Sequence, residues 1–204
     1  MQLADLRSCG LDIDIDMRYA SADNFTGAPV YACGHALLHL DALACLAAAV
    51  RLAARQGLRL RLYDAYRPPE AQWKLWKHTP DPDFLAHPER GSPHSRGVAV
   101  DVTLIDGQGQ ALDMGTAFDA FTLRSHHGEA GVDAEAERNR LVLLGIMTTA
   151  GWDFYRNEWW HYQLFNARHL YPLIPDGGSG PALMAAAAVS PGAGANGQEN
   201  AATG

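Results

Sequence analysis

The Ala- and Leu-rich segment 36–56 constrains the fold of this chain more than any other part of the sequence. Its apolar residues recur at helical spacing, and Gly57 stands where a glycine commonly ends a helix. Directly afterwards Leu58, Leu60 and Leu62 alternate with arginines, which predicts a strand with one buried face. A long helix followed at once by such a strand predicts a helix that covers a sheet.

Strand and helix patterns continue along the rest of the chain. β-Branched and apolar residues fill 98–104, which predicts a buried strand, and 135–150 has the apolar spacing of a second long helix. The other predicted elements are a short strand at 13–17, a helix opened by Pro68 and Pro69, and a hairpin formed by 152–155 and 159–165. This order predicts an α+β domain with helices packed on a largely antiparallel sheet.

The composition changes near the C-terminal end. Residues 177–204 hold 16 Ala or Gly among 28, no aromatic residue and one charged residue, Glu199. Such a segment buries too little apolar surface to offset the entropy lost on ordering, so we expect a disordered tail. Residues 1–176 suit one compact domain.

Charge and cysteine content argue against several classes of protein. The net charge of -7 makes a nucleic-acid partner unexpected, because phosphate backbones are bound by clustered Lys and Arg. The three cysteines include no CxxC pair, which argues against a disulfide framework and a zinc finger. No stretch approaches the roughly 20 apolar residues that span a bilayer, and the first residues do not resemble a signal peptide. We therefore expect a soluble cytoplasmic protein, whose oligomeric state stays open.

Two distant segments carry residues suited to metal chemistry. In the first, 92–101, His94 precedes the predicted strand and Asp101 lies within it. Positions seven apart on a flat strand face opposite sides, so the two side chains converge only if the chain bends, and Gly97 supplies the freedom for a bend. Alone, such a pair is more often a surface histidine beside a structural aspartate.

The second segment, 158–162, reads Glu-Trp-Trp-His-Tyr. His161 would complete a set of two imidazoles and one carboxylate, which suits zinc and leaves a fourth position for water. Zinc lowers the pKa of bound water, and Glu158 would take the proton and pass it to a leaving amine. Alone, the segment would be interpreted as an aromatic core hairpin, and only both segments together favour a metal site.

A third candidate is the segment 64–68, at the end of the strand that begins near Leu58. An arginine held there, Arg67, could stabilise the oxyanion that develops on an attacked carbonyl, with Asp64 orienting it. A surface salt bridge between the two is the alternative interpretation.

The pattern SxHxxGxAxD followed by ExxH resembles the zinc peptidases that include D-Ala-D-Ala carboxypeptidases, lysostaphin-type enzymes and the hedgehog signalling domain. Within this group the sequence is similar to the D-alanyl-D-alanine dipeptidases of the VanX type over roughly residues 10–170. Further matching segments are 19–21, 23–27, 64–68, 114–115, 118–119 and 124–127. The resemblance implies a hedgehog/D-Ala-D-Ala peptidase-like fold, with 1–176 as a zinc dipeptidase domain.

The resemblance also implies roles for particular positions. His94, Asp101 and His161 would hold one zinc ion per chain, and Glu158 would be the catalytic base. Arg67 would stabilise the tetrahedral intermediate. Asp119 would bind the free ammonium of the substrate and so restrict the enzyme to dipeptides. Further substrate contacts would come from Ser92, Tyr19 and Trp159. His126 and His127 would support the site.

The implied reaction is hydrolysis of D-Ala-D-Ala or a closely related D,D-dipeptide. A D,D-carboxypeptidase or L,D-endopeptidase acting on longer wall peptides is the nearest alternative, and a zinc-bearing binding module without catalysis is a third. Two departures from the family bear on substrate range: the loop 81–91 is shorter than expected, and Pro93 replaces a small hydroxyl residue. The preferred dipeptide, and a role in antibiotic resistance or in D-alanine recovery, stay open.

Overall fold

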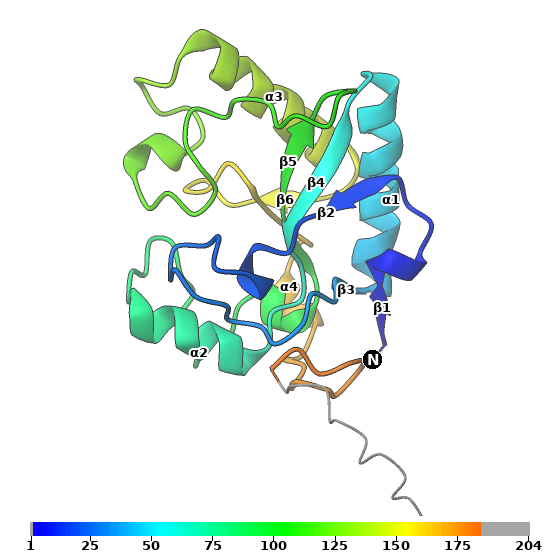
Figure 1. The fold of residues 1–204 in the computed structure, drawn as a ribbon, viewed down its shortest axis with the longest axis vertical. Helices are drawn as coiled ribbons and strands as arrows, with labels where there is room; N and C mark the ends of the chain where they lie inside the picture. Colours follow the sequence, from blue (N-terminus) through cyan, green and yellow to red (C-terminus); the bar gives the residue numbers. More distant parts are fainter. Residues whose placement is uncertain (1, 185–204) are drawn as a thin grey trace, which may run out of the picture.

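The computed structural model describes residues 2–184, and a five-stranded sheet forms the centre of this part of the chain (Figure 1). β2 pairs with its neighbour in parallel and all other neighbours are antiparallel, so the predicted α+β fold with a largely antiparallel sheet is confirmed. In spatial order the strands are β2 (Ile13–Ile15), β4 (Arg59–Asp64), β5 (Ala99–Ile105), β7 (His161–Gln163) and β6 (Asp153–Phe154).

Two long helices, α1 (Leu40–Arg55) and α3 (Ala134–Thr149), pack against each other and against the sheet. α1 contacts β4 and α3 contacts β5, so together they cover one face. The Asp133 side chain caps α3 by accepting two backbone N–H groups of its first turn. The helix that begins at the predicted proline pair, α2 (Pro69–His78), lies at the other end of the domain from α3 (Figure 1).

The predicted helix at 36–56 begins later than expected. Its first residues form β3 (Leu37–His39), which pairs antiparallel with β1 (Leu3–Asp5) in a separate two-stranded sheet. The prediction is wrong here because a strand far away in the sequence satisfies the backbone groups of these residues, and this pairing overrides local helix preference.

The core lies between the sheet and the two long helices. β5 is buried along its whole length, as predicted. Val100 and Val102 belong to the apolar core, and because successive side chains on a strand point to opposite faces, Asp101 faces away from them. The packing of the helices therefore fixes the position of a carboxylate on the other face of the sheet.

The chain after β7 continues into α4 (Ala167–Leu170) and then returns to the domain. Leu183 is fully buried, its carbonyl accepts the N–H of Ala32, and its own N–H is bound by the Asp176 carboxylate. The folded unit thus reaches at least residue 184, beyond the boundary predicted at 176. The rest of the predicted tail, 185–204, lies outside the described residues.

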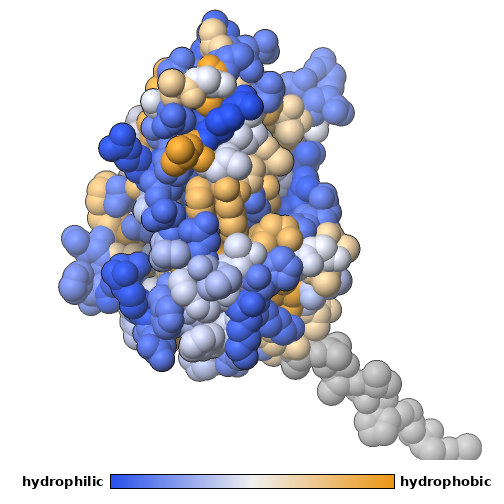
Figure 2. Space-filling model, turned by 90° about the vertical axis from the view of Figure 1, so that its left-hand side faces the viewer, coloured by the Kyte–Doolittle hydropathy of each residue, from blue (hydrophilic) through white to orange (hydrophobic). Residues whose placement is uncertain are grey.

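The surface of the described residues is mixed in character. On the face shown in Figure 2, apolar side chains gather in the middle, between largely hydrophilic areas above and below. No helix in residues 2–184 is long and apolar enough to cross a membrane. The three cysteines are free thiols.

Candidate metal centre and active site

Strand pairing brings two of the predicted ligands together. Asp101 on β5 lies directly opposite His161 on β7 in the antiparallel register. His94 lies in a single 3-10 turn just before β5, and Gly97 ends that turn in a left-handed conformation with φ 68°. A side chain at Gly97 would also collide with Leu3 at 2.5 Å, so the bend predicted between His94 and Asp101 requires glycine.

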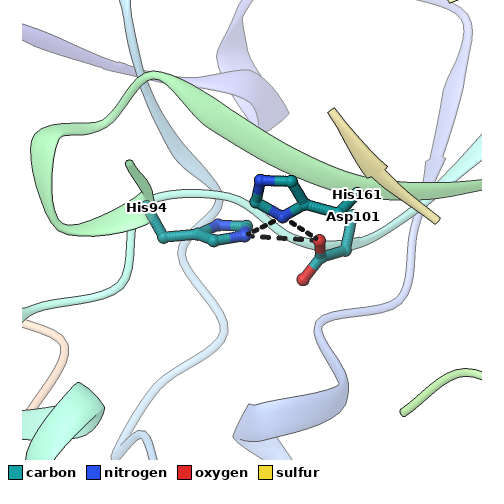
Figure 3. A group of neighbouring side chains, drawn as sticks. All are labelled: His94, Asp101 and His161. Atoms are coloured by element: carbon teal, nitrogen blue, oxygen red, sulfur yellow. Dashed lines mark hydrogen bonds and ion pairs between the residues drawn. The ribbon is translucent and has the colours of Figure 1, made fainter. Parts of the chain in front are cut away.

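The three side chains converge on one point (Figure 3). His94 Nε2 lies 3.1 Å from His161 Nδ1, and Asp101 Oδ1 lies 3.1 Å from His161 Nδ1 and 3.3 Å from His94 Nε2. All three residues are buried. Bonds of about 2.0–2.2 Å at tetrahedral angles separate zinc ligands by roughly 3.3–3.5 Å, close to these distances.

The chemistry of the donors also fits a cation. His94 Nδ1 faces the carbonyl oxygen of Ala65 at 2.7 Å and therefore carries the proton, which leaves a lone pair on Nε2. His161 Nε2 faces the Gln163 side-chain oxygen at 3.2 Å, which leaves a lone pair on Nδ1. Both lone pairs point at the Asp101 carboxylate, an arrangement that is repulsive without a positive ion between them. The residues therefore fit a divalent metal.

Electrostatics favour the protonation states that a metal needs. Burial lowers the pKa of His161 and so keeps the imidazole neutral. Burial raises the pKa of Asp101, but the neighbouring imidazoles outweigh this effect and hold the pKa below its ordinary value. Both groups are thus ready to act as ligands near neutral pH.

Arg67 is held by hydrogen bonds on all sides of its guanidinium. Nε donates to Asp64 at 2.8 Å, Nη1 to the Gln72 side chain at 3.1 Å, and Nη2 to Asp101 at 3.4 Å. Asp64 is fully buried and also accepts the Tyr31 hydroxyl at 2.8 Å. The alternative of a surface salt bridge is therefore wrong, and Arg67 is fixed beside the metal-binding side chains.

Two further carboxylates lie near the converging donors. Glu158 Oε2 lies 3.8 Å from His161 Nδ1, and burial, followed by the charges of Asp101 and Asp119, raises the pKa of Glu158. Asp119 has a left-handed backbone with φ 58°, uncommon for a residue other than glycine, and it accepts the Tyr19 hydroxyl at 2.8 Å. Burial also raises the pKa of Asp119.

A cavity of ≈ 90 Å³ connects these groups. At about 10–15 Å³ for each water-sized site, it suits a small ligand rather than a folded polypeptide. Asp64 lies behind Arg67 and does not line the cavity. Eight residues predicted for the site do line it: Tyr19, Arg67, Ser92, His94, Asp101, Asp119, Glu158 and His161.

One predicted substrate contact is not part of this wall. Trp159 is buried, its indole N–H donates to Thr116 at 2.8 Å, and it does not line the cavity, whereas Trp160 does. The prediction for Trp159 needs correction because the tight turn that carries Glu158 directs neighbouring side chains to opposite sides.

The loop 81–91 supplies Phe84, Leu85 and Ala86 to the wall of the cavity. Phe84 stacks on Phe121 with ring centroids 5.0 Å apart, and the Asp83 carbonyl accepts the hydroxyl of Tyr155. The Gln72 side chain donates to the Ala86 carbonyl at 2.8 Å and so ties this loop to Arg67.

His127 contacts the hairpin that carries Glu158. Its backbone N–H donates to the Arg156 carbonyl, two residues before Glu158. Burial, followed by the charge of Arg140, lowers the pKa of His127 to about 4, so the imidazole is neutral near pH 7.

Sequence reasoning missed Tyr31 and Gln72. Tyr31 belongs to no motif, and its contact with Asp64 spans 33 positions. Gln72 lies five positions after Arg67, on the helix that the proline pair predicts. This short spacing is the single local signal that could have suggested a contact between Gln72 and Arg67.

A mixed sheet that places two imidazoles, one carboxylate, a buried glutamate and an arginine around a small cavity defines a metal-dependent hydrolase. A family model described as D-Ala-D-Ala dipeptidase, of the M15 peptidases, matches residues 1–175. The chain belongs to this family.

Relatives support the same assignment. The D-alanyl-D-alanine dipeptidase of Escherichia coli (strain K12) is 45% identical over 175 residues, which cover 86% of this chain and 90% of that relative. The D-alanyl-D-alanine dipeptidase of Enterococcus faecium is 38% identical over 170 residues, covering 73% and 84%. The protein of the same name from Enterococcus faecalis is 34% identical over 174 residues, covering 74% and 85%.

Proposed function

We propose that this protein is a zinc dipeptidase that hydrolyses D-Ala-D-Ala or a closely related D,D-dipeptide. The observation that carries the proposal is the convergence of His94, Asp101 and His161 in the cavity that also contains Glu158. The similarity to relatives named D-alanyl-D-alanine dipeptidase supports the choice of substrate.

Zinc is the metal we propose for the site. Two imidazoles and one carboxylate at tetrahedral spacing are a common catalytic zinc set with one open position. A bound zinc ion would supply a Lewis acid and lower the pKa of water toward neutrality.

Glu158 is proposed as the general base and acid. Its carboxylate lies close to His161 but is not one of the three converging donors, so it is free to accept a proton from water. Its raised pKa suits a group that gains and then returns a proton near neutral pH. The proton would go to the departing amine of the second D-alanine.

Arg67 is proposed to stabilise the negative charge that develops on the attacked carbonyl oxygen. Its hydrogen bonds to Asp64 and Gln72 hold it in place before substrate arrives. A donor that is already oriented needs no reorganisation during the reaction, which is how such groups lower barriers.

Asp119 is proposed to bind the free ammonium of the substrate, together with the Tyr19 hydroxyl that already contacts it. An acylated amino group carries no charge, and it would leave the buried Asp119 carboxylate without a cationic partner. This selection favours dipeptides over the ends of longer peptides, which argues for a dipeptidase rather than a carboxypeptidase.

The test is a panel of D,D-, L,D- and L,L-dipeptides and N-acetyl-D-Ala-D-Ala, incubated with zinc-loaded protein and assayed for released amino acids. We expect cleavage of the free D,D-dipeptides above all others. Equal cleavage of the N-acetylated substrate would contradict the role of Asp119, and no cleavage of D,D-dipeptides by zinc-loaded protein would contradict the proposed function.

The base assignment has its own test. Glu158→Gln should keep one zinc per chain and lower kcat by roughly 10²–10⁴, the usual contribution of general acid–base help. Glu135→Gln, on the exposed first turn of α3, is the matched control and should leave kcat unchanged. Near-normal turnover by Glu158→Gln would contradict the assignment.

A further inference from the structure

Arg168 is the second arginine in the wall of the cavity, and its charge has no partner within residues 2–184. The other arginine, Arg67, uses its guanidinium nitrogens on Asp64, Gln72 and Asp101. Arg168 forms no hydrogen bond or ion pair in the described part of the chain, and it is exposed to solvent on α4. A charge of this kind is available to a ligand.

Arg168 lies where the cavity opens to the surface. It lines the cavity and also an adjoining surface depression of ≈ 310 Å³. Pro93, Tyr155 and Gln163 are shared by both hollows as well. A ligand that fills the cavity therefore has one end next to Arg168.

The strand register places Arg168 beyond the metal-binding side chains. Gln163, which lines the cavity with Arg168, lies two residues after His161 on the same face of β7, about 7 Å further along the strand. The turn after β7 leads directly into α4, which carries Arg168.

Asp119 lines the cavity but not the depression at its opening. It accepts the Tyr19 hydroxyl at 2.8 Å, and neither residue lines the depression that Arg168 shares with the cavity. The wall of the cavity thus carries a carboxylate away from the opening and, at the opening, a guanidinium with no hydrogen bond or ion pair among the described residues.

A free dipeptide has the complementary order of charges. Its ammonium and carboxylate are separated by at most about 7 Å in an extended chain, with the scissile bond between them. The acids that line the cavity, Asp101, Asp119 and Glu158, would repel the substrate carboxylate wherever no cation opposes them.

We propose that Arg168 binds the terminal carboxylate of the substrate and thereby selects dipeptides with a free C-terminus. This inference rests on the proposed function. It adds recognition of the substrate C-terminus to the recognition of the N-terminus by Asp119. Ser92, whose hydroxyl oxygen accepts the N–H of His94, can add a neutral hydrogen bond from the same wall but no positive charge.

The experiment compares D-Ala-D-Ala with its C-terminal amide, using wild type, Arg168→Gln, Arg168→Lys and the control Arg138→Gln. Arg138 is exposed on α3 and does not line the cavity. For Arg168→Gln we expect the kcat/KM for the free dipeptide to fall on the order of tenfold, mainly through a higher KM, because one partly exposed charge pair is lost. Wild type and Arg168→Gln should cleave the amide equally. Arg168→Lys should recover part of the kcat/KM that Arg168→Gln loses on the free dipeptide.

Binding is measured separately from turnover by calorimetry with D-Ala-D-Ala on zinc-loaded Glu158→Gln, with and without Arg168→Gln. We expect the Kd to rise by a similar factor, and added salt to weaken binding less when Arg168 is absent. Equal losses on dipeptide and amide, an unchanged Kd, or no dipeptide binding at all would overturn the role of Arg168. If binding of the dipeptide depends on Arg168 but wild type does not hydrolyse it, only the proposed catalysis is overturned.

Discussion

Replacing Tyr31 by phenylalanine measures how strongly the hydrogen bonds behind Arg67 stabilise the protein. Tyr31 is 2% exposed, and its hydroxyl donates to Asp64 Oδ1 at 2.8 Å. Asp64 is fully buried, and within the described residues this oxygen has no other hydrogen-bond partner. A hydrogen bond to a charged group contributes about 1.5–3 kcal/mol, so Tyr31→Phe should lower the free energy of unfolding by that amount. For a chain of this length the Tm should fall by roughly 3–12 °C.

Tyr162→Phe is the matched control. The hydroxyl of Tyr162 is buried but has no hydrogen-bond partner in the described part of the chain, so its removal should change stability little. Wild type and both variants are unfolded by urea and by heat at one excess zinc concentration, because bound metal itself adds stability. Equal unfolding midpoints for Tyr31→Phe and Tyr162→Phe would refute the reasoning.

Three further predictions follow from the same contacts. Removal of the metal by a chelator should lower the free energy of unfolding by about 3–4 kcal/mol relative to protein with zinc at 100–1,000 times its Kd. Scanning calorimetry measures this change, and a Tm that the chelator leaves unchanged would show that the three donors hold no metal. Gln72→Ala should lower kcat roughly tenfold at unchanged zinc content, because Arg67 and the Ala86 carbonyl each lose a hydrogen bond; kinetics equal to wild type would count against this link. Trp159→Phe should cost about 1 kcal/mol of stability and leave KM unchanged, since the indole binds Thr116, and a raised KM would restore Trp159 as a substrate contact.

The ligand segments were predictable because each is a short pattern with local physical meaning. His94, Gly97 and Asp101 lie within eight positions, and the need for a bend between a histidine and an aspartate on a strand follows from strand geometry alone. Glu158 and His161 are three positions apart in an equally compact segment. The resemblance to a known family connected the two segments, which spacing could not do.

The contacts that hold the site together were not predictable in this way. Tyr31 reaches Asp64 across 33 positions, and Tyr19 reaches Asp119 across 100. Neither spacing matches the periodicity of a strand or a helix, so no pattern in the sequence predicts these contacts. The choice between Trp159 and Trp160 as the wall of the cavity likewise depends on the path of a turn.

The sequence by itself determined the two long helices, the buried strand at the centre of the sheet and the residues that carry metal chemistry. These features depend on periodicity and on residue type, which are local properties of the chain. The tertiary structure alone decided that 37–39 join a strand, that 177–184 return to the domain, and that Arg168 lies in the wall of the cavity. Each of these depends on which distant segment supplies the partner for a backbone or side-chain group, and that is settled only when the whole chain packs.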